Sequence, residues 1–372
     1  MAVHSEPIVG TSAPPALGRR AVVRRLAAGA LLAICLLTVL LAVPDLRPVV
    51  HEVREMDPAL VLAALGLELA SCLSFVTVFR LFFPAIPRRP ARELAWTQMG
   101  SGALLPGGGI GSLAAGGWLL HLAGMPGREI VRRSSGLFFL TSAINVLVLG
   151  LAGALLLLQG PDGAKGVLLG GLPVLTAVTA VAGTLCLPPL ARRIGAGHPR
   201  AGWIEALGQG IPDARQAITR PSWGLLGATG YLLLDIAVLW VCLAAVGPAP
   251  PAAALVVAYL VGYLANAVPV PGGVGVLDVG LVGALALYGL PLDHAAAGVL
   301  VYHAIAFWIP AIGGTVAYGR LRHGDLPSAA AGSLTILREV REPDVSSPRT
   351  PPGAPSWNTA SAGRAHARNS AG

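Results

Sequence analysis

Apolar stretches about as long as a bilayer is thick recur along this sequence. A transmembrane helix needs roughly 20 mainly apolar residues. Runs close to that length cover these ranges: 26–43, 58–81, 134–158, 166–187, 223–246 and 296–318. Only 12% of the 372 residues are charged, which is about half the share found in a soluble domain. The sequence therefore predicts an all-α, polytopic membrane helix bundle.

Arginines in the connecting segments predict how this bundle is oriented. Cytoplasmic loops are enriched in Lys and Arg, and basic residues cluster before residue 26, after residue 81 and within 188–222. We therefore expect a multi-pass protein of the cell (plasma) membrane with both termini in the cytoplasm, and the acidic loop 44–57 on the outside. These basic loops account for the net charge of +8, so we expect no nucleic-acid partner.

Composition divides the chain into a membrane domain, 19–323, and two tails. The tails, 1–18 and 324–372, are polar and are predicted to be disordered. Within the domain, the basic cytoplasmic loop 188–222 contains WIEALGQGIPDARQAI, which predicts a short interfacial helix. The four cysteines lie in separate apolar runs without metal-ligand spacing, so we expect no metal site and no cofactor.

Two further apolar segments, 93–123 and 252–290, do not fit simple spans. LLPGGGIG interrupts the first and VPVPGGVG interrupts the second, which leaves arms of roughly 13–18 residues that are marginal for a crossing. Irregular backbone at membrane depth is tolerated only where protein or a water-filled cavity satisfies its polar groups. We therefore expect each segment to form a broken helical hairpin.

The two broken segments belong to an internal repeat. A shift of 165 residues aligns PGG at 106–108 with PGG at 271–273, and GMP at 124–126 with GLP at 289–291. Upstream, Glu68 and Asp235 correspond within two residues. The predicted repeats cover about 58–158 and about 223–318.

The charges around the hairpins predict that the two repeats have inverted topology. Arg128, Arg132 and Arg133 follow the first hairpin, whereas no Lys or Arg flanks the second. Each segment would then be a re-entrant hairpin, and the two would enter from opposite faces. Inverted repeats with broken helices near the bilayer midplane are typical of transporters. Two helices that are merely kinked for packing are the structural alternative.

The sequence also indicates where a substrate would bind. The helix that starts after each Pro-Gly-Gly exposes backbone N–H groups, which suit a lipid phosphate. Ionisable side chains within spans usually face a cavity or a partner, and Asp278 could pair with His303. We predict these substrate-binding residues, and no catalytic ones: Pro106, Gly107, Gly108, Asn266, Pro271, Gly272, Gly273, Gly275, Asp278, His303, Glu68 and Asp235. A buried pair without a substrate role, and glycines that only permit tight packing, are the alternatives.

NAVPVPGGVGVLDVGLVGALALYGLP, followed by GVLVYHAIAFWIPAIGG, resembles the lysylphosphatidylglycerol synthase transmembrane-region family of flippase-like proteins. The resemblance covers about residues 20–322. It implies a membrane part that moves an aminoacylated lipid, without the separate soluble domain that makes this lipid. Relative to the family pattern, Asp278 replaces Glu, His303 replaces Arg, and Ser112 and Gly116 lie where charged residues are common.

Three functions remain open at this stage. The leading hypothesis is a lipid flippase or transporter for an anionic or aminoacylated headgroup, with membrane lipids as its ligands. A membrane-embedded transferase would need Asp278 and His303 as an acid–base pair. A non-catalytic partner subunit of a lipid synthase or glycosyltransferase would dock that lipid-modifying enzyme through 188–222 and the C-terminal tail.

Overall fold

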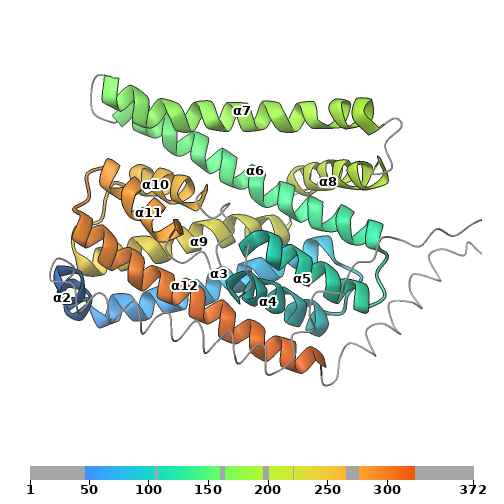
Figure 1. Ribbon diagram of the computed structural model, residues 1–372, viewed down its shortest axis with the longest axis horizontal. Coiled ribbons are helices and arrows are strands. Elements are labelled where there is room, and N and C mark those ends of the chain that lie inside the picture. Colours follow the sequence, from blue (N-terminus) through green and yellow to red (C-terminus); the bar gives the residue numbers. More distant parts are fainter. Residues whose placement is uncertain are drawn as a thin grey trace, which may run out of the picture.

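The computed structural model describes residues 47–104, 108–159, 164–195, 201–220, 222–264 and 276–322. Within these ranges the chain is helical, with short connections and no strand, and the helices form one elongated bundle (Figure 1). The all-α prediction is therefore confirmed for this part of the chain. The expected first span, 26–43, and the two predicted tails lie outside the described residues.

Five of the helices are long and apolar enough to cross a membrane. They are α3 (Pro58–Phe82), α6 (Gly127–Gln159), α7 (Ala164–Gly195), α9 (Trp223–Val246) and α12 (Leu292–Arg320). Each contains one of the predicted spans, which are therefore confirmed as helices. Helix α6 begins before its predicted range because the charged segment GREIVRR forms its first turns. Helix α7 ends after its predicted range because the basic segment ARRIG continues the helix.

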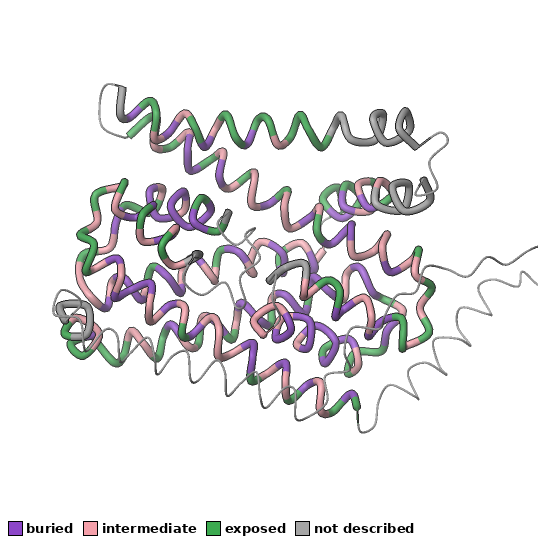
Figure 2. The backbone as a smooth tube through the Cα atoms, viewed as in Figure 1, coloured by how far each residue is buried: buried purple, intermediate pink, exposed green. Residues whose placement is uncertain are grey.

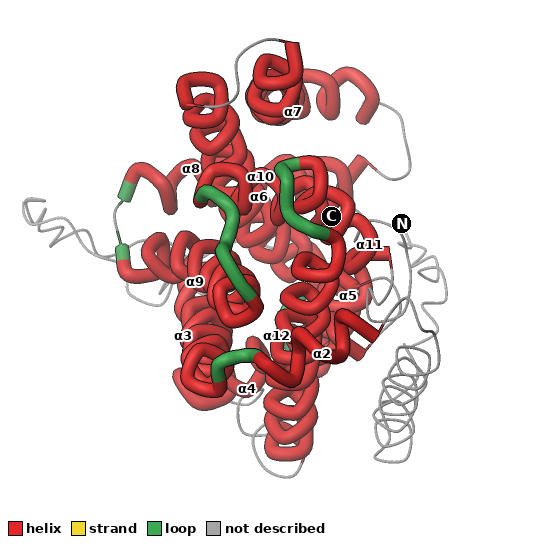
Figure 3. The backbone as a smooth tube through the Cα atoms, turned by 90° about the vertical axis from the view of Figure 1, so that its left-hand side faces the viewer, coloured by secondary structure: helices red, strands yellow, loops and turns green. Residues whose placement is uncertain are grey.

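The surface of the bundle is apolar, as a lipid environment requires. Helix α7 lies along one edge (Figures 1 and 3) and is exposed over much of its length (Figure 2). Its exposed side chains include Val167, Leu172, Leu175 and Val178. Contiguous exposed apolar surface of this extent is rare on soluble proteins, so these side chains are expected to contact acyl chains.

Two short polar segments form helices of their own. The predicted loop 44–57 contains α2 (Arg47–Glu55). In it, Val53 packs on the core, and His51 Nδ1 lies 3.4 Å from the carboxylate of Glu55, one turn away. The interpretation of this segment as a loop is therefore wrong for residues 47–55. The helix expected in the basic loop is confirmed as α8 (Ala201–Thr219).

Both interrupted segments are pairs of short helices. The first contains α4 (Arg88–Leu104) and α5 (Gly108–Leu122), and the second contains α10 (Ala252–Leu264) and α11 (Val276–Leu287). The two members of each pair pack against each other. Their lengths, from 17 residues in α4 to 12 in α11, are below the roughly 20 that a span needs.

Helix boundaries follow the 165-residue offset of the sequence repeat. Helix α3 begins at Pro58 and α9 at Trp223, and α6 begins at Gly127 and α12 at Leu292.

The ends of α5 and α11 also share one form of C-terminal cap. Gly124 and Gly289 have positive φ values of 84° and 96°. The N–H group of the next residue donates to a carbonyl five residues back, from Met125 to Leu120 and from Leu290 to Leu285. The two halves of the bundle are thus built with matching local structure.

The first and last parts of the bundle meet at a close backbone contact. A Cβ atom on Gly100 of α4 would lie 2.7 Å from the carbonyl oxygen of Pro310 and 2.8 Å from Cα of Gly314, both in α12. Small residues allow membrane helices to approach this closely. The first hairpin is therefore held directly on α12.

Candidate functional site

Most of the predicted hairpin residues lie outside the described part of the chain. These are Pro106, Gly107, Asn266, Pro271, Gly272, Gly273 and Gly275. Gly108 is described as the first residue of α5. The binding role predicted for these residues stays a prediction.

Asp278 and His303 lie in contact, as the sequence suggested. Asp278 lies in the first turn of α11, where a negative charge is favoured by the helix dipole. Its Oδ1 atom lies 2.9 Å from Nδ1 of His303 on α12. The His303 ring also stacks on Phe307 at a centroid distance of 6.2 Å. The Asp278 side chain is 26% exposed and the His303 side chain is 15% exposed, so this pair lies at the edge of the protein interior.

The repeat-related acids Glu68 and Asp235 also lie near each other. They belong to α3 and α9, which pack against each other, and Asp235 disfavours a negative charge on Glu68. Glu68 is only 4% exposed. Its Oε1 atom accepts a weak hydrogen bond from the Cys72 thiol at 3.5 Å, and its Oε2 atom has no hydrogen-bond partner among the described residues.

Two tyrosines that the sequence reasoning missed hold Asp235. The Tyr259 hydroxyl of α10 donates to Oδ2 at 2.5 Å, and the Tyr302 hydroxyl of α12 donates to Oδ1 at 3.1 Å. The two tyrosine rings contact each other edge to face. A tyrosine inside an apolar run was the available signal, because a buried hydroxyl needs a partner. Through these bonds Asp235 connects α9 to both the second hairpin and the last span.

Ser112 and Gly116, which occupy positions where the family often has charges, serve packing here. The Ser112 hydroxyl of α5 donates to the backbone oxygen of Gln98 in α4 at 2.9 Å. A Cβ atom on Gly116 would lie 3.0 Å from the Gln98 side-chain oxygen. The described part of the first hairpin therefore closes on a buried glutamine rather than on a charged pair.

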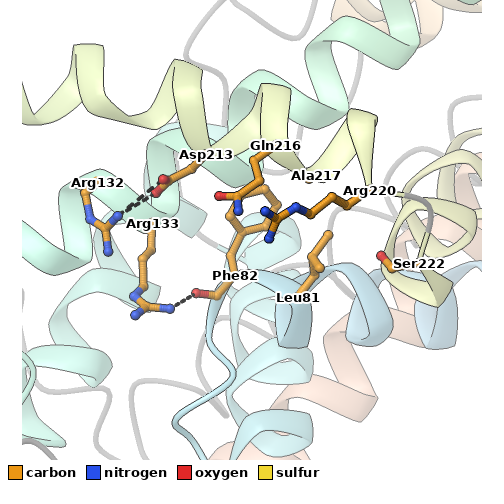
Figure 4. Close-up of a pocket in the computed structure, with 9 residues that line it drawn as sticks. All are labelled: Leu81, Phe82, Arg132, Arg133, Asp213, Gln216, Ala217, Arg220 and Ser222. Atoms are coloured by element: carbon orange, nitrogen blue, oxygen red, sulfur yellow. Dashed lines mark hydrogen bonds and ion pairs between the residues drawn. The ribbon is translucent and has the colours of Figure 1, made fainter. Parts of the chain in front are cut away.

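A cavity of about 320 Å³ lies where the ends of α3, α6, α8 and α9 meet (Figure 4). Its wall combines apolar side chains (Leu81, Phe82 and Ala217) with polar ones (Arg132, Arg133, Asp213, Gln216, Arg220 and Ser222). Sequence reasoning identified these arginines only as markers of orientation. Nothing in a single sequence shows that α8 folds back onto the start of α6.

Arg220 gives this cavity its unbalanced charge. Arg132 pairs with Asp213 at 2.9 Å and with Glu129, and Arg133 contacts Glu129 and donates to the Phe82 carbonyl oxygen. The Arg220 guanidinium group has neither an ion-pair nor a hydrogen-bond partner among the described residues, and it extends towards Gln216 and Phe82 (Figure 4). The Ser222 hydroxyl, which also lines the cavity, is buried and finds no hydrogen-bond partner in the described part of the chain. A phosphate-bearing anion suits these free donors.

Long apolar helices around buried acids and tyrosines define a multi-pass α-helical membrane protein. Sequence comparison identifies the particular group: residues 26–314 match the lysylphosphatidylglycerol synthase TM region, and the chain belongs to this family.

Part of this chain is also similar to a UPF0104 membrane protein of Methanothermobacter thermautotrophicus. It is 35% identical to this chain over 101 residues. The match covers 26% of this chain and 29% of that relative. It agrees with the assignment to a membrane protein family.

Proposed function

We propose that this protein moves lipids with anionic or aminoacylated headgroups across the cell membrane. The observation that carries this proposal is the presence of ionisable and hydroxyl side chains within a bundle of apolar helices, in one group from α3, α9, α10 and α12 and in the Asp278–His303 pair of α11 and α12. Such side chains are costly at membrane depth and usually mark a substrate or ion pathway. We assign transport to this chain and no covalent step.

We also propose that the two halves are inverted repeats with re-entrant hairpins. The matched helix starts, the matched caps at Gly124 and Gly289 and the packing of each short helix pair support this topology. Arginines after the first hairpin and their absence around the second support hairpins that enter from opposite faces. The termini would then lie in the cytoplasm, and so would the arginine-lined cavity.

The lipid path would run between the second hairpin and the last span. A phosphate would first meet Arg220 in the cavity, and the headgroup would then pass the Asp278–His303 pair. The contact between a carboxylate and an imidazole can be exchanged for contacts with a headgroup, because the carboxylate can accept from a cationic group and the imidazole can donate to a phosphate. The acyl chains would stay in the bilayer.

Reconstituted protein provides the test. We would follow fluorescent phosphatidylglycerol, lysylphosphatidylglycerol and phosphatidylcholine in proteoliposomes, with a membrane-impermeant quencher reporting the leaflet of each lipid. We expect movement of the first two lipids by the wild type and a clear reduction in Asp278→Asn. Val279→Ala, which changes an adjacent side chain that is 73% exposed, should behave like the wild type.

Absence of lipid movement by well-folded protein would refute the proposal. The partner-subunit hypothesis would then be tested by copurification with a lipid-modifying enzyme, with and without the segment 188–222.

A further inference from the structure

Two buried glutamates of this protein are compensated in opposite ways. Glu68 and Glu93 are both 4% exposed. The Glu93 carboxylate lies 3.1 Å from Arg92 and 3.5 Å from Arg320. Glu68 has only the Cys72 thiol as a donor, and its Oε2 atom is unpartnered among the described residues.

A neighbouring acid makes ionisation of Glu68 less favourable still. Asp235 interacts with it electrostatically across the α3–α9 interface. Like charges that are close together cannot both be ionised without a large penalty. Within the described part of the chain, neither carboxylate forms an ion pair with Lys, Arg or His.

The other titratable groups that face this acid pair are neutral donors. They are Cys72 of α3, Tyr231 of α9, Tyr259 of α10 and Tyr302 of α12, and Tyr263 of α10 stacks on Tyr259. Helices α4 and α6 also contact α3, and from them no hydrogen bond or ion pair to either acid occurs among the described residues. The cluster therefore contains two acids and, in its described portion, no base.

The hydrogen bonds distinguish the two acids. Asp235 accepts one tyrosine hydroxyl on each oxygen, and hydrogen bonds to a carboxylate stabilise its ionised form. Asp235 also keeps partial exposure. Glu68 is the more deeply buried acid and the one whose charge is left uncompensated, and a buried carboxyl group in that position becomes neutral by binding a proton.

We propose that Glu68 and Asp235 form a proton-binding site, in which Glu68 holds one exchangeable proton while Asp235 stays ionised on its two tyrosines. The use of this proton to drive lipid movement rests on the proposed function. The site itself does not. A hard metal cation would need more oxygen ligands than the pair provides, and no group of three or more metal-binding side chains occurs among the described residues.

Infrared difference spectroscopy tests the site without any transport assay. Purified protein in nanodiscs is titrated over pH in light and heavy water. We expect the C=O stretch of a protonated carboxyl group at neutral pH, lost in Glu68→Gln and retained in Glu93→Gln, the matched buried acid with arginine partners. Tyr302→Phe removes one donor from Asp235, so the proton should be held to higher pH.

Three results would overturn the proposal. The first is that the wild type lacks this band, and the second is that the band survives in Glu68→Gln. The third is that sodium chloride abolishes the band whereas choline chloride leaves it unchanged. The last result would identify a sodium site. Asp235→Asn provides a second readout: it removes the neighbouring charge but leaves Glu68 buried, so the carboxyl band should persist in it and be lost at a lower pH than in the wild type.

Proteoliposomes with an imposed pH gradient then test the use of the proton. We expect the gradient to accelerate lipid movement by the wild type and to have no effect in Glu68→Gln. A confirmed infrared band without any lipid movement would leave the proton site intact and refute the proposed function. Lipid movement without the band would support the proposed function and refute the proton site.

Discussion

The two hairpins are attached to the rest of the bundle by different kinds of contact. The first lies on α12 through Gly100, at backbone distance, and through the Glu93–Arg320 ion pair. The second is joined to α12 by Asp278 and His303, and to α9 by the bond from Tyr259 to Asp235. Close backbone packing fixes a geometry, whereas polar pairs can change partners. Under the proposed function, the backbone contact at Gly100 would fix the first hairpin, and the second hairpin would be the half that handles the charged headgroup.

The largest effect is expected where the first hairpin meets α12. The Cβ atom of Gly100→Ala would overlap backbone atoms of Pro310 and Gly314, so the helices must separate. Overpacking of this kind costs about 2–3 kcal/mol, which thermal unfolding in detergent would detect. Gly319→Ala on α12, with no neighbouring atom within 4 Å, should show no loss. Equal stability of both variants would show that the first hairpin is not fixed.

Removal of the charged pair should slow transport without unfolding the protein. His303→Phe keeps an aromatic ring on Phe307 and removes the contact with Asp278. We expect lipid movement in proteoliposomes to fall about tenfold, which corresponds to about 1.4 kcal/mol. Phe307→Leu removes the ring contact and keeps the contact between His303 and Asp278, so it should have the smaller effect. If Phe307→Leu is the slower variant, the pair is structural.

The arginine-lined cavity should discriminate lipids by charge. Arg220→Gln removes the one cavity arginine without a described partner, so anionic lipid binding should weaken by about 1 kcal/mol, the usual contribution of a basic residue at a membrane surface. Binding to nanodiscs with and without phosphatidylglycerol measures this. Arg128→Gln, an exposed arginine outside the cavity wall, is the control. Competition by free inorganic phosphate would separate a phosphate site from a lipid site.

The smallest effect is expected inside the first hairpin. Ser112→Ala removes one hydrogen bond to the Gln98 carbonyl oxygen, which should lower the free energy of unfolding by about 0.5–1 kcal/mol. Lipid movement should be unchanged, because the first hairpin carries no proposed charge contact there. A strong transport defect in this variant would contradict the division between the two hairpins.

The sequence predicted the features that depend on local patterns. Hydropathy indicated the five long helices, and Pro-Gly-Gly indicated the two breaks. The spacing of Asp278 and His303, which lie on neighbouring apolar helices, was enough to suggest their contact. Local periodicity failed for α2, because its mixed charge concealed Val53, the side chain that packs on the core.

Contacts between distant segments could not be predicted in the same way. Tyr302 reaches Asp235 across 67 residues, and Arg132 reaches Asp213 across 81. Each depends on how two helices are rotated against each other, which hydropathy does not determine. The same reason explains why the arginines were understood as orientation signals and not as the wall of a cavity.

Photocrosslinking by a lipid tests most directly whether the second hairpin handles the substrate. We would incorporate a phosphatidylglycerol with a photoactivatable headgroup into nanodiscs and map its adducts by mass spectrometry. We expect adducts in α11 and α12 around Asp278 and His303, and their loss in Asp278→Asn. Helix α7, with its exposed apolar surface, provides the background from bulk lipid. Adducts confined to α7, or an equal yield in both hairpins, would contradict the assignment.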